Sequence, residues 1–245
     1  MTKLREKEPF TCLILCRHGE TDYPEDRFYP SEWDSASGLA SAGPGRGGIG
    51  GNFSLYPHGP PQINEGGFVK GPELNPEGLM QAQRLGKYFA EIEALDAIYT
   101  SPTVRTRQTM EPIAQGREIS MAVLPELMER RMGQWDGRSA EEIQREDPEG
   151  WKRWKTEPLT FSPPGGESLR DFSHRVVKAI GSILDTETGG TVAVVTHGGP
   201  IRVATAEALG IPLENCKRLV VAPGSITRIH YTKSWPNLIL FGYQP

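Results

Sequence analysis

Residues 11–22, "TCLILCRHGETD", begin with an apolar run and turn without a spacer to Arg17 and His18. A short apolar run bounded by Pro9 and Gly19 predicts a β-strand that is buried on both of its faces. A buried strand does not end in two side chains that can carry positive charge unless a negative group lies nearby. We therefore expect an anion at the end of this strand.

Strand and helix patterns alternate along most of the remaining chain. Asn75, Pro76 and Glu77 have the order of a helix N-cap, a first-turn proline and an acidic first turn. Ser101 and Pro102 predict the start of another helix in the same way. Strands are expected at 11–16, 96–101, 119–124, 191–196, 219–222, 226–231 and 238–243, and helices at 75–92, 102–115, 167–184 and, as short pieces, within 139–155. This alternation predicts an α/β fold, a three-layer α/β/α sandwich with a mostly parallel sheet.

Length and composition narrow the class of protein. The 245 residues suit one α/β domain, although two small domains stay open as an alternative. The net charge of -4 gives no electrostatic footprint for nucleic acid or for an anionic membrane. The charged N-terminus has no signal-peptide core, and no apolar run is long enough to span a membrane, so we expect a cytoplasmic protein.

The three cysteines do not form a pattern that is typical of a disulfide framework or of a zinc site. The number of cysteines is odd, and no two of them are spaced as a CxxC pair: Cys12, Cys16 and Cys216. Cys12 and Cys16 lie four residues apart on the first strand and so share one face of it. We expect them to be small buried apolar residues.

Two predicted strands each end in a histidine. His18 follows the first strand and His197 follows the strand at 191–196, and ligands of open α/β sheets bind beyond such carboxyl ends. A lone histidine there would more often be a loop residue, but two at one edge beside Arg17 favour a ligand site. Arg105 lies at the start of a predicted helix, where an anion would sit, whereas Arg107 is expected to be solvated.

Six motifs in order resemble the histidine phosphatase superfamily, the family of phosphoglycerate mutases and related phosphatases. They are "RHGET" at 17–21, "LNPEGLMQA" at 74–82, "TSPTVRTRQT" at 100–109, "LMERRMGQWDG" at 127–137, "PGGES" at 164–168 and "VVTHGG" at 194–199. The resemblance implies the phosphoglycerate mutase-like fold, and it extends over nearly the whole chain. It also implies that His18 is a nucleophile that becomes phosphohistidine.

The resemblance implies roles for four further residues. Arg17, Arg105 and His197 would line the phosphate pocket, and Glu129 would donate the proton to the leaving group. Two arginines suit the equatorial oxygens of a transferring phosphoryl group, because each guanidinium is a forked donor. A neutral imidazole can attack in line if a hydrogen bond to its other nitrogen fixes the tautomer. A carboxyl beside a phosphate dianion keeps its proton until the leaving group needs it, because like charges disfavour ionisation.

Other assignments near these residues are open. Glu126 competes with Glu129 as proton donor, and a surface carboxylate is the plain alternative for either. Glu20 is expected to be structural or to lie at the rim of the pocket. The Thr21 hydroxyl can hydrogen-bond phosphate, and Gly198 follows the second histidine as a further phosphate-binding position. The scheme requires neither a metal ion nor a cofactor.

Hydrolysis of a small-molecule phosphate is the preferred reaction. The "WN" pair that is usual in the mutase branch is missing from "TDYPEDRF", where Arg27 is a speculative substitute, and "GQWDG" is phosphatase-like. The alternatives are a cofactor-dependent phosphoglycerate mutase and a catalytically inert binding protein on the same fold. The late strands could pair with a second copy at a sheet edge, which leaves a homodimer open.

A glycine-rich insert at about 22–73 interrupts the single domain predicted for residues 1–245. Its "GPGRGGIGG" contains GxGxxG but follows no strand, so the dinucleotide fingerprint is not met. A flexible linker and a substrate lid are equally open alternatives. Aromatic side chains favour the lid, which could stack on a flat nucleotide, flavin or other aromatic phosphate: Trp33, Phe53, Tyr56, His58 and Phe68.

Overall fold

A six-stranded sheet forms the centre of the computed structural model, which describes residues 10–24, 27–28, 71–91 and 95–245. The strands are β1 (Thr11–Arg17), β2 (Ala97–Thr100), β3 (Ser120–Val123), β4 (Thr191–Thr196), β5 (Ile226–Tyr231) and β6 (Pro236–Tyr243). Their order across the sheet is β3-β2-β4-β1-β5-β6. The pairs from β3 to β1 are parallel, and those of β5 with β1 and β6 are antiparallel. The prediction of a mostly parallel sheet is confirmed.

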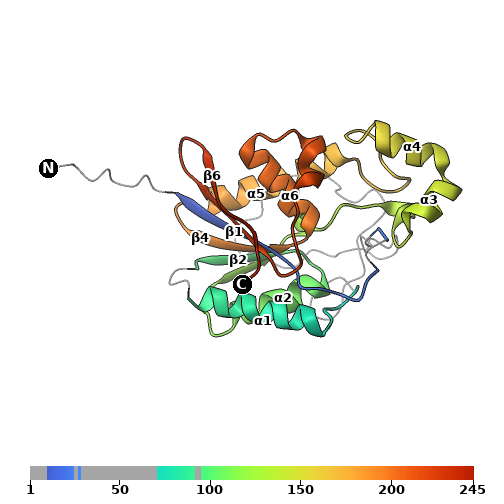
Figure 1. Cartoon of the computed structure of the whole chain (residues 1–245). Helices are drawn as coiled ribbons and strands as arrows, with labels where there is room; N and C mark the ends of the chain where they lie inside the picture. The colour runs from blue at the N-terminus through green and yellow to red at the C-terminus, as the bar shows by residue number, and fades with distance from the viewer. Residues whose placement is uncertain (1–9, 25–26, 29–70, 92–94) are drawn as a thin grey trace, which may run out of the picture.

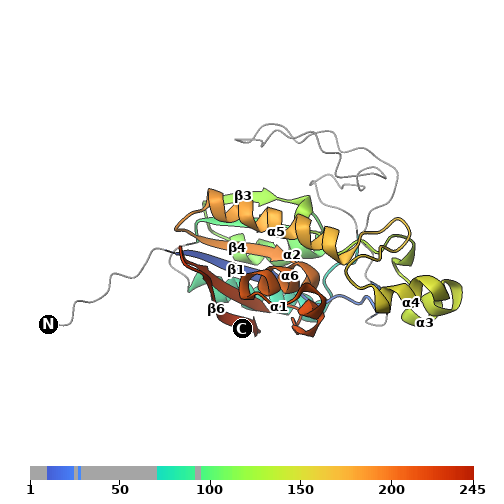
Figure 2. The ribbon, with the colours of Figure 1, turned by 90° about the horizontal axis from the view of Figure 1, so that it is seen from above.

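Helices cover both faces of the sheet. They are α1 (Pro76–Ala90), α2 (Val104–Ala114), α3 (Ala140–Glu146), α4 (Pro148–Thr156), α5 (Leu169–Thr186) and α6 (Gly198–Leu209). Figure 1 shows α1 and α2 on one face and α5 and α6 on the other, which is the predicted three-layer arrangement. From above, α3 and α4 project beyond the end of the sheet (Figure 2). That end is the carboxyl end of β1 and β4, where the sequence predicts the ligand site.

The alternation of side chains along β1 divides the core into two layers. Leu13 and Leu15 pack in the cluster that contains residues of α5 and α6. Cys12, Ile14 and Cys16 pack on the opposite side with residues of α1 and α2. All three cysteines are buried free thiols, which confirms the prediction that Cys12 and Cys16 are buried. The central strand is therefore buried on both faces and fixes the direction in which its last residues leave the sheet.

The turn after β1 rests directly on the first turn of α1. The Asn75 side chain accepts a hydrogen bond from the Gly78 amide at 2.8 Å, so the predicted cap is confirmed. A Cβ at Gly19 would lie 2.4 Å from the Gly78 carbonyl oxygen. The glycine after His18 is therefore required by its close contact with the first turn of α1.

The connection from α6 to β5 differs from the prediction. The expected strand at 219–222 is wrong, because the carbonyls that would join a sheet accept side-chain hydrogen bonds instead. Arg202 Nε donates to the Leu219 carbonyl at 2.9 Å, and Arg17 Nη1 donates to the Val221 carbonyl at 2.5 Å. Val220 between them is 77% exposed. Residues 219–222 instead form an irregular segment between a short 3₁₀ helix, η3 (Leu213–Arg218), and a turn at 223–224.

Aromatic side chains build a small core at the end of the sheet. Figure 1 shows α3 and α4 there, in agreement with the short helices expected within 139–155. Trp135 is 2% exposed, and its ring centroid lies 5.7 Å from that of Trp154 and 5.5 Å from that of Phe161. Phe28 also packs against this cluster. A second, smaller core thus holds the segment that follows Glu129.

Most of the predicted insert, together with its aromatic residues, lies outside the described residues, so the lid and the single-domain boundary stay predictions. Among the helices of the described part, none has the length and apolar character needed to cross a membrane. The homodimer also stays a prediction.

Candidate active site

His18 and His197 lie side by side at the carboxyl ends of neighbouring strands. Strands β1 and β4 are parallel with Arg17 opposite Thr196, and the His18 amide donates to the Thr196 carbonyl at 2.9 Å. The centroids of the two imidazole rings are 5.1 Å apart with the planes at 67°. His18 is 4% exposed and His197 is 1% exposed. The sheet thus brings together two histidines that are far apart in sequence.

The hydrogen bond of His18 fixes its tautomer. Its Nδ1 lies 2.7 Å from the Gly19 carbonyl oxygen. A carbonyl only accepts, so Nδ1 carries the proton and Nε2 is the nitrogen with the lone pair. This is the state that an imidazole needs in order to act as a nucleophile.

His197 connects the two polar groups on either side of it. Arg105 Nη2 lies 3.2 Å from His197 Nδ1, and the Ser101 Oγ lies 2.8 Å from Nε2. Because the guanidinium only donates, Nδ1 accepts and Nε2 donates to the serine. The prediction that Ser101 caps a helix is wrong: α2 begins at Val104 with Thr103 at its N-cap position, and Ser101 orients His197 instead.

Two arginines bring positive charge to the histidines. Arg105 is 1% exposed, and Arg17 packs beside Gly198, the first residue of α6. The Thr109 hydroxyl accepts from the Gly19 amide at 3.0 Å and donates to the Arg105 carbonyl at 2.8 Å, which fastens α2 to the turn that carries His18. Four of the five predicted catalytic residues therefore form one cluster, in which His18, Arg105 and His197 are buried and Arg17 is partly exposed.

Glu129 lies at the N-terminus of α6, next to this cluster. Its Oε2 accepts from the Gly199 amide at 2.9 Å, and its Oε1 accepts from the Arg130 amide at 2.8 Å. A Cβ at Gly199 would lie only 1.9 Å from Oε1, so the carboxylate can occupy this place only beside a glycine. Glu129, the fifth predicted catalytic residue, is thus bound to a helix residue, Gly199, that follows His197 by two positions.

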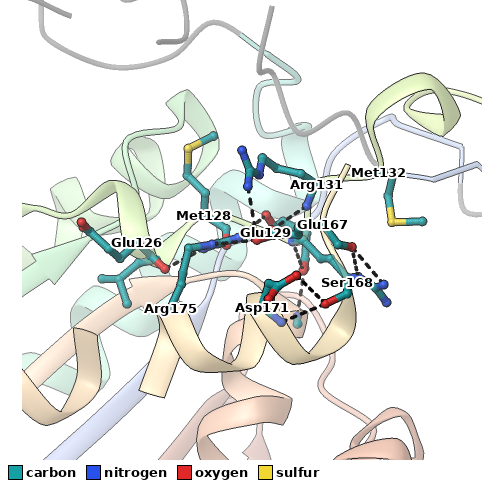
Figure 3. Close-up of polar contacts among 12 residues, drawn as sticks. Glu126, Met128, Glu129, Arg131, Met132, Glu167, Ser168, Asp171 and Arg175 are labelled. Carbon is teal, nitrogen blue, oxygen red and sulfur yellow. Dashed lines mark hydrogen bonds and ion pairs between the residues drawn. The ribbon is translucent and has the colours of Figure 1, made fainter. Parts of the chain in front are cut away.

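A buried polar network holds the loop that carries Glu129. Figure 3 shows Glu167 and Arg175 beneath this loop, with Glu126 at its far end. Arg175 donates to the Glu129 carbonyl at 3.1 Å and to the Glu167 carboxylate at 2.5 Å. The sequence predicts "PGGES" as a motif but gives no sign of Arg175, because no local pattern shows which carbonyls an arginine will reach.

A family model for the histidine phosphatase superfamily (branch 1) matches residues 54–243, more than half of the chain. The chain belongs to this superfamily. The match includes Arg105, Glu129 and His197, while Arg17 and His18 precede it and join them through the pairing of β1 with β4. The family predicted from the six motifs is confirmed.

Relatives of this histidine phosphatase include enzymes with different substrates in their names. Phosphoserine phosphatase 1 of Hydrogenobacter thermophilus is 32% identical over 162 residues, which cover 65% of this chain and 76% of that protein. Adenosylcobalamin/α-ribazole phosphatase of Escherichia coli is 26% identical over 187 residues, 75% and 92% of the two chains. The solved structure of Bacillus stearothermophilus YhfR superposes with a TM-score of 0.71 at 28% identity and covers 95% of this chain and 96% of that one.

Three other predicted residues of this histidine phosphatase have partners at the edge of the site. Thr21 pairs with Leu74 as a single β-bridge, and its role in phosphate binding stays a prediction. Glu20 accepts from Asn75 Nδ2 at 2.9 Å, which fits the expected structural role. Arg27 makes two contacts of 3.2 Å to the Glu142 carboxylate, so its speculative role at the phosphate has no support from this arrangement.

Glu129 also faces a cavity of about 220 Å³ between α4, the start of α5, α6 and η3. Apolar, cationic and anionic side chains line it together: Trp154, Leu169, Phe172, Arg130, Arg202, Lys217, Glu129 and Glu214. Residues 10–24, 27–28, 71–91 and 95–245 contain no group of three His, Cys, Asp or Glu side chains that could hold a metal ion, at this cavity or away from it. The cavity provides space for an organic group next to the carboxylate.

The histidine pair makes the stability of the ligand-free protein depend on pH. Burial first, and then the charges of Arg105 and Arg17, lower the pKa of His18 well below 6.5. Burial, then Arg105, the neighbouring His18 and Arg17, lower the pKa of His197 in the same way. The unfolded chain therefore binds more protons below pH 6.5, and stability is lost as the pH falls.

We expect each of these two histidines to contribute a loss of about 2 kcal/mol in the free energy of unfolding between about pH 7.5 and about pH 5. Urea unfolding at a series of pH values measures it. The His197→Asn protein should show a smaller loss, and inorganic phosphate should reduce the loss in the unmodified protein by adding negative charge. Identical pH profiles for both proteins would contradict the assignment.

Proposed function

We propose that this histidine phosphatase hydrolyses small-molecule phosphate monoesters through a phosphohistidine at His18. One observation carries the proposal: two buried imidazoles with fixed tautomers lie within the field of Arg17 and Arg105, and a carboxylate lies at the adjoining helix N-terminus. The cluster has positive charge for a phosphoryl group, a nitrogen for attack and a carboxyl for proton transfer. The names of two relatives, both phosphatases, support the reaction class.

In the first step, the His18 Nε2 lone pair attacks phosphorus opposite the ester oxygen. The N–P bond forms as the P–O bond breaks, and the electron pair passes to the leaving oxygen, which takes a proton from the Glu129 carboxyl. The guanidinium groups of Arg17 and Arg105 stabilise the three equatorial oxygens. The start of α6 contributes amides and the positive end of a helix dipole near the same charge.

In the second step, water replaces the alcohol. Glu129, now ionised, takes a proton from the water as its oxygen attacks phosphorus, and the N–P bond breaks to regenerate neutral His18 and inorganic phosphate. The Gly19 carbonyl holds the same imidazole proton throughout. Protons and electron pairs balance over the two steps without a metal ion or a cofactor, and metal independence is part of the proposal.

The leaving group is proposed to enter the cavity beside Glu129. The proton donor must lie next to the ester oxygen, so the alcohol extends from this carboxyl into the space that it faces. Aromatic and cationic linings together suit an alcohol with an apolar body and an acidic or polar end. Bulky aromatic, nucleotide or flavin-type phosphates stay within this class.

The proton donor is tested by varying the leaving group. In a single turnover, we expect Glu129→Gln to lower the rate of alcohol release from an alkyl phosphate by about 10² to 10⁴, because an alkoxide needs the proton. The loss in the rate of nitrophenolate release from p-nitrophenyl phosphate should be much smaller, since nitrophenolate leaves without one. Release of the alcohol or nitrophenolate is measured, because it precedes the step in which Glu129 activates water for both substrates.

Glu126→Gln is the matched control, because Glu126 is the competing candidate three residues earlier. It should behave as the unmodified protein on both substrates. A leaving-group effect in Glu126→Gln but not in Glu129→Gln would transfer the role to Glu126. Efficient interconversion of phosphoglycerates with a bisphosphoglycerate primer, and little free phosphate, would favour the mutase alternative. No turnover of any phosphate would favour an inert binding protein.

A further inference from the structure

One arginine, Arg175, binds the backbone of the loop that carries Glu129 from Glu126 to Glu129. Arg175 Nη1 donates to the carbonyls of Glu126 at 2.7 Å and Met128 at 2.9 Å, and Nη2 donates to the Glu129 carbonyl at 3.1 Å. The guanidinium also contacts both oxygens of Glu167, at 2.5 Å from Nη2 and 3.2 Å from Nε. Figure 3 shows these hydrogen bonds meeting at the side chain of Arg175, which extends from α5.

The partner of this arginine holds the other end of the loop. Glu167 Oε1 accepts from the Arg131 amide at 2.9 Å, and the Glu167 amide donates to the Arg131 carbonyl at 3.0 Å. The side chains are almost removed from solvent, with exposures of 3% for Glu167 and 13% for Arg175. The pair therefore binds the backbone on both sides of Glu129 while leaving its carboxylate at the Gly199 amide.

We propose that Glu167 and Arg175 are positioning residues that hold the Glu129 carboxyl at the place where it transfers a proton. This inference rests on the proposed function. Buried ion pairs are often no better for stability than apolar residues of the same volume, so stability alone gives weak reason for this one. A planar guanidinium has five donors, which here meet three carbonyls and a carboxylate at once, and lysine cannot reproduce that geometry.

The role predicts a specific kinetic defect. A catalytic group that is displaced by about 1 Å loses much of its effect, while groups on other elements keep theirs. Arg17, His18, Arg105 and His197 come from β1, α2 and the β4–α6 junction, none of which uses Arg175 for its hydrogen bonds to the cluster. Disturbing the pair should therefore impair protonation of the leaving group and spare phosphate binding.

Arg175→Lys and Glu167→Gln test the inference with full-length protein. In a single turnover, we expect each to lower the rate of alcohol release from an alkyl phosphate by about 10- to 100-fold, and the rate of nitrophenolate release from p-nitrophenyl phosphate by less than about 3-fold. KM for both substrates and inhibition by inorganic phosphate should change little. Two variants are used so that a folding defect in one of them, detected by its melting temperature, leaves the other as the test.

Matched controls make the same substitutions at polar contacts far from Glu129. Arg228→Lys alters an arginine of β5 that donates to the Tyr88 hydroxyl, and Glu187→Gln alters a carboxylate that accepts from the Tyr99 hydroxyl at 2.7 Å. Both should retain the leaving-group dependence of the unmodified protein. A dependence altered equally in these controls would show general loosening and would overturn the inference.

The outcomes separate this inference from the proposed function. Equal losses on both substrates in Arg175→Lys and Glu167→Gln would mean a purely structural pair and would overturn the positioning role. If Glu129→Gln shows the leaving-group effect and the pair variants do not, only the positioning role fails. If Glu129→Gln also lacks the effect, the proton-donor assignment fails and the positioning role fails with it.

Discussion

His18→Ala is expected to lower kcat for every phosphate monoester by at least about 10⁴-fold, because the nitrogen that forms the covalent intermediate is gone. No described side chain can replace it in line, since His197 Nδ1 faces Arg105 and its Nε2 donates to Ser101. Release of inorganic phosphate from a panel of monoesters is the measurement. The loss should be independent of the leaving group, which distinguishes it from the loss in Glu129→Gln.

An exposed histidine gives a matched control for this experiment. His174 lies on α5 at the surface, and His174→Ala should keep full activity. Alkaline quenching of the unmodified protein with substrate should trap phosphate on His18, because the N–P bond of a phosphoramidate survives base better than acid. Substantial turnover by His18→Ala, or phosphate trapped on another residue, would refute the mechanism.

Arg105→Met should cause the next largest loss, about 10³-fold in kcat/KM, because it removes a buried forked donor from the transferring phosphoryl group. Arg105→Lys keeps the positive charge but not the forked pair of donors, so we expect its kcat/KM to lie between that of Arg105→Met and that of the unmodified protein. Inhibition by inorganic phosphate should weaken in the same order. Initial rates with p-nitrophenyl phosphate are sufficient, since the effect does not depend on proton donation.

Arg107 is the matched control for Arg105 on the same helix. It is 36% exposed at its side chain and pairs with Glu111 at 3.1 Å, as expected for a solvated arginine. Arg107→Met should therefore change kcat/KM by less than about 2-fold, because exposed ion pairs contribute little. Equal losses in Arg105→Met and Arg107→Met would mean that α2 contributes only general charge to the site.

The fold was predictable wherever it depends on local pattern. The apolar runs of β1 and β4 and the Asn75-Pro76 cap each contain their own signal, and the structure has these elements within a few residues of their expected bounds. The helix α6 has no such signal, because it starts with two glycines and a proline and is buried around much of its circumference. A helix without a polar face lacks the periodicity that sequence analysis uses.

The site was predictable for residues at strand ends and not for residues that act through distant contacts. His18 and His197 follow buried strands, and the topology of a parallel sheet brings such ends together. Ser101 and Arg175 reach the site through hydrogen bonds that depend on the final packing of α2 and α5. The local sequence around Ser101 is equally compatible with a helix cap, and that around Arg175 is equally compatible with a surface arginine.

The position of β1 in the sheet also determines when the protein can become active during its synthesis. This strand begins the described chain, yet both of its neighbours, β4 and β5, come from residues 191–196 and 226–231. Contacts of such long sequence separation form slowly, and a growing chain can complete the sheet around β1 only after residues 191–196 and 226–231 have left the ribosome. His18 is therefore made early but gains His197 late, so the nascent chain cannot transfer phosphate before the sheet closes.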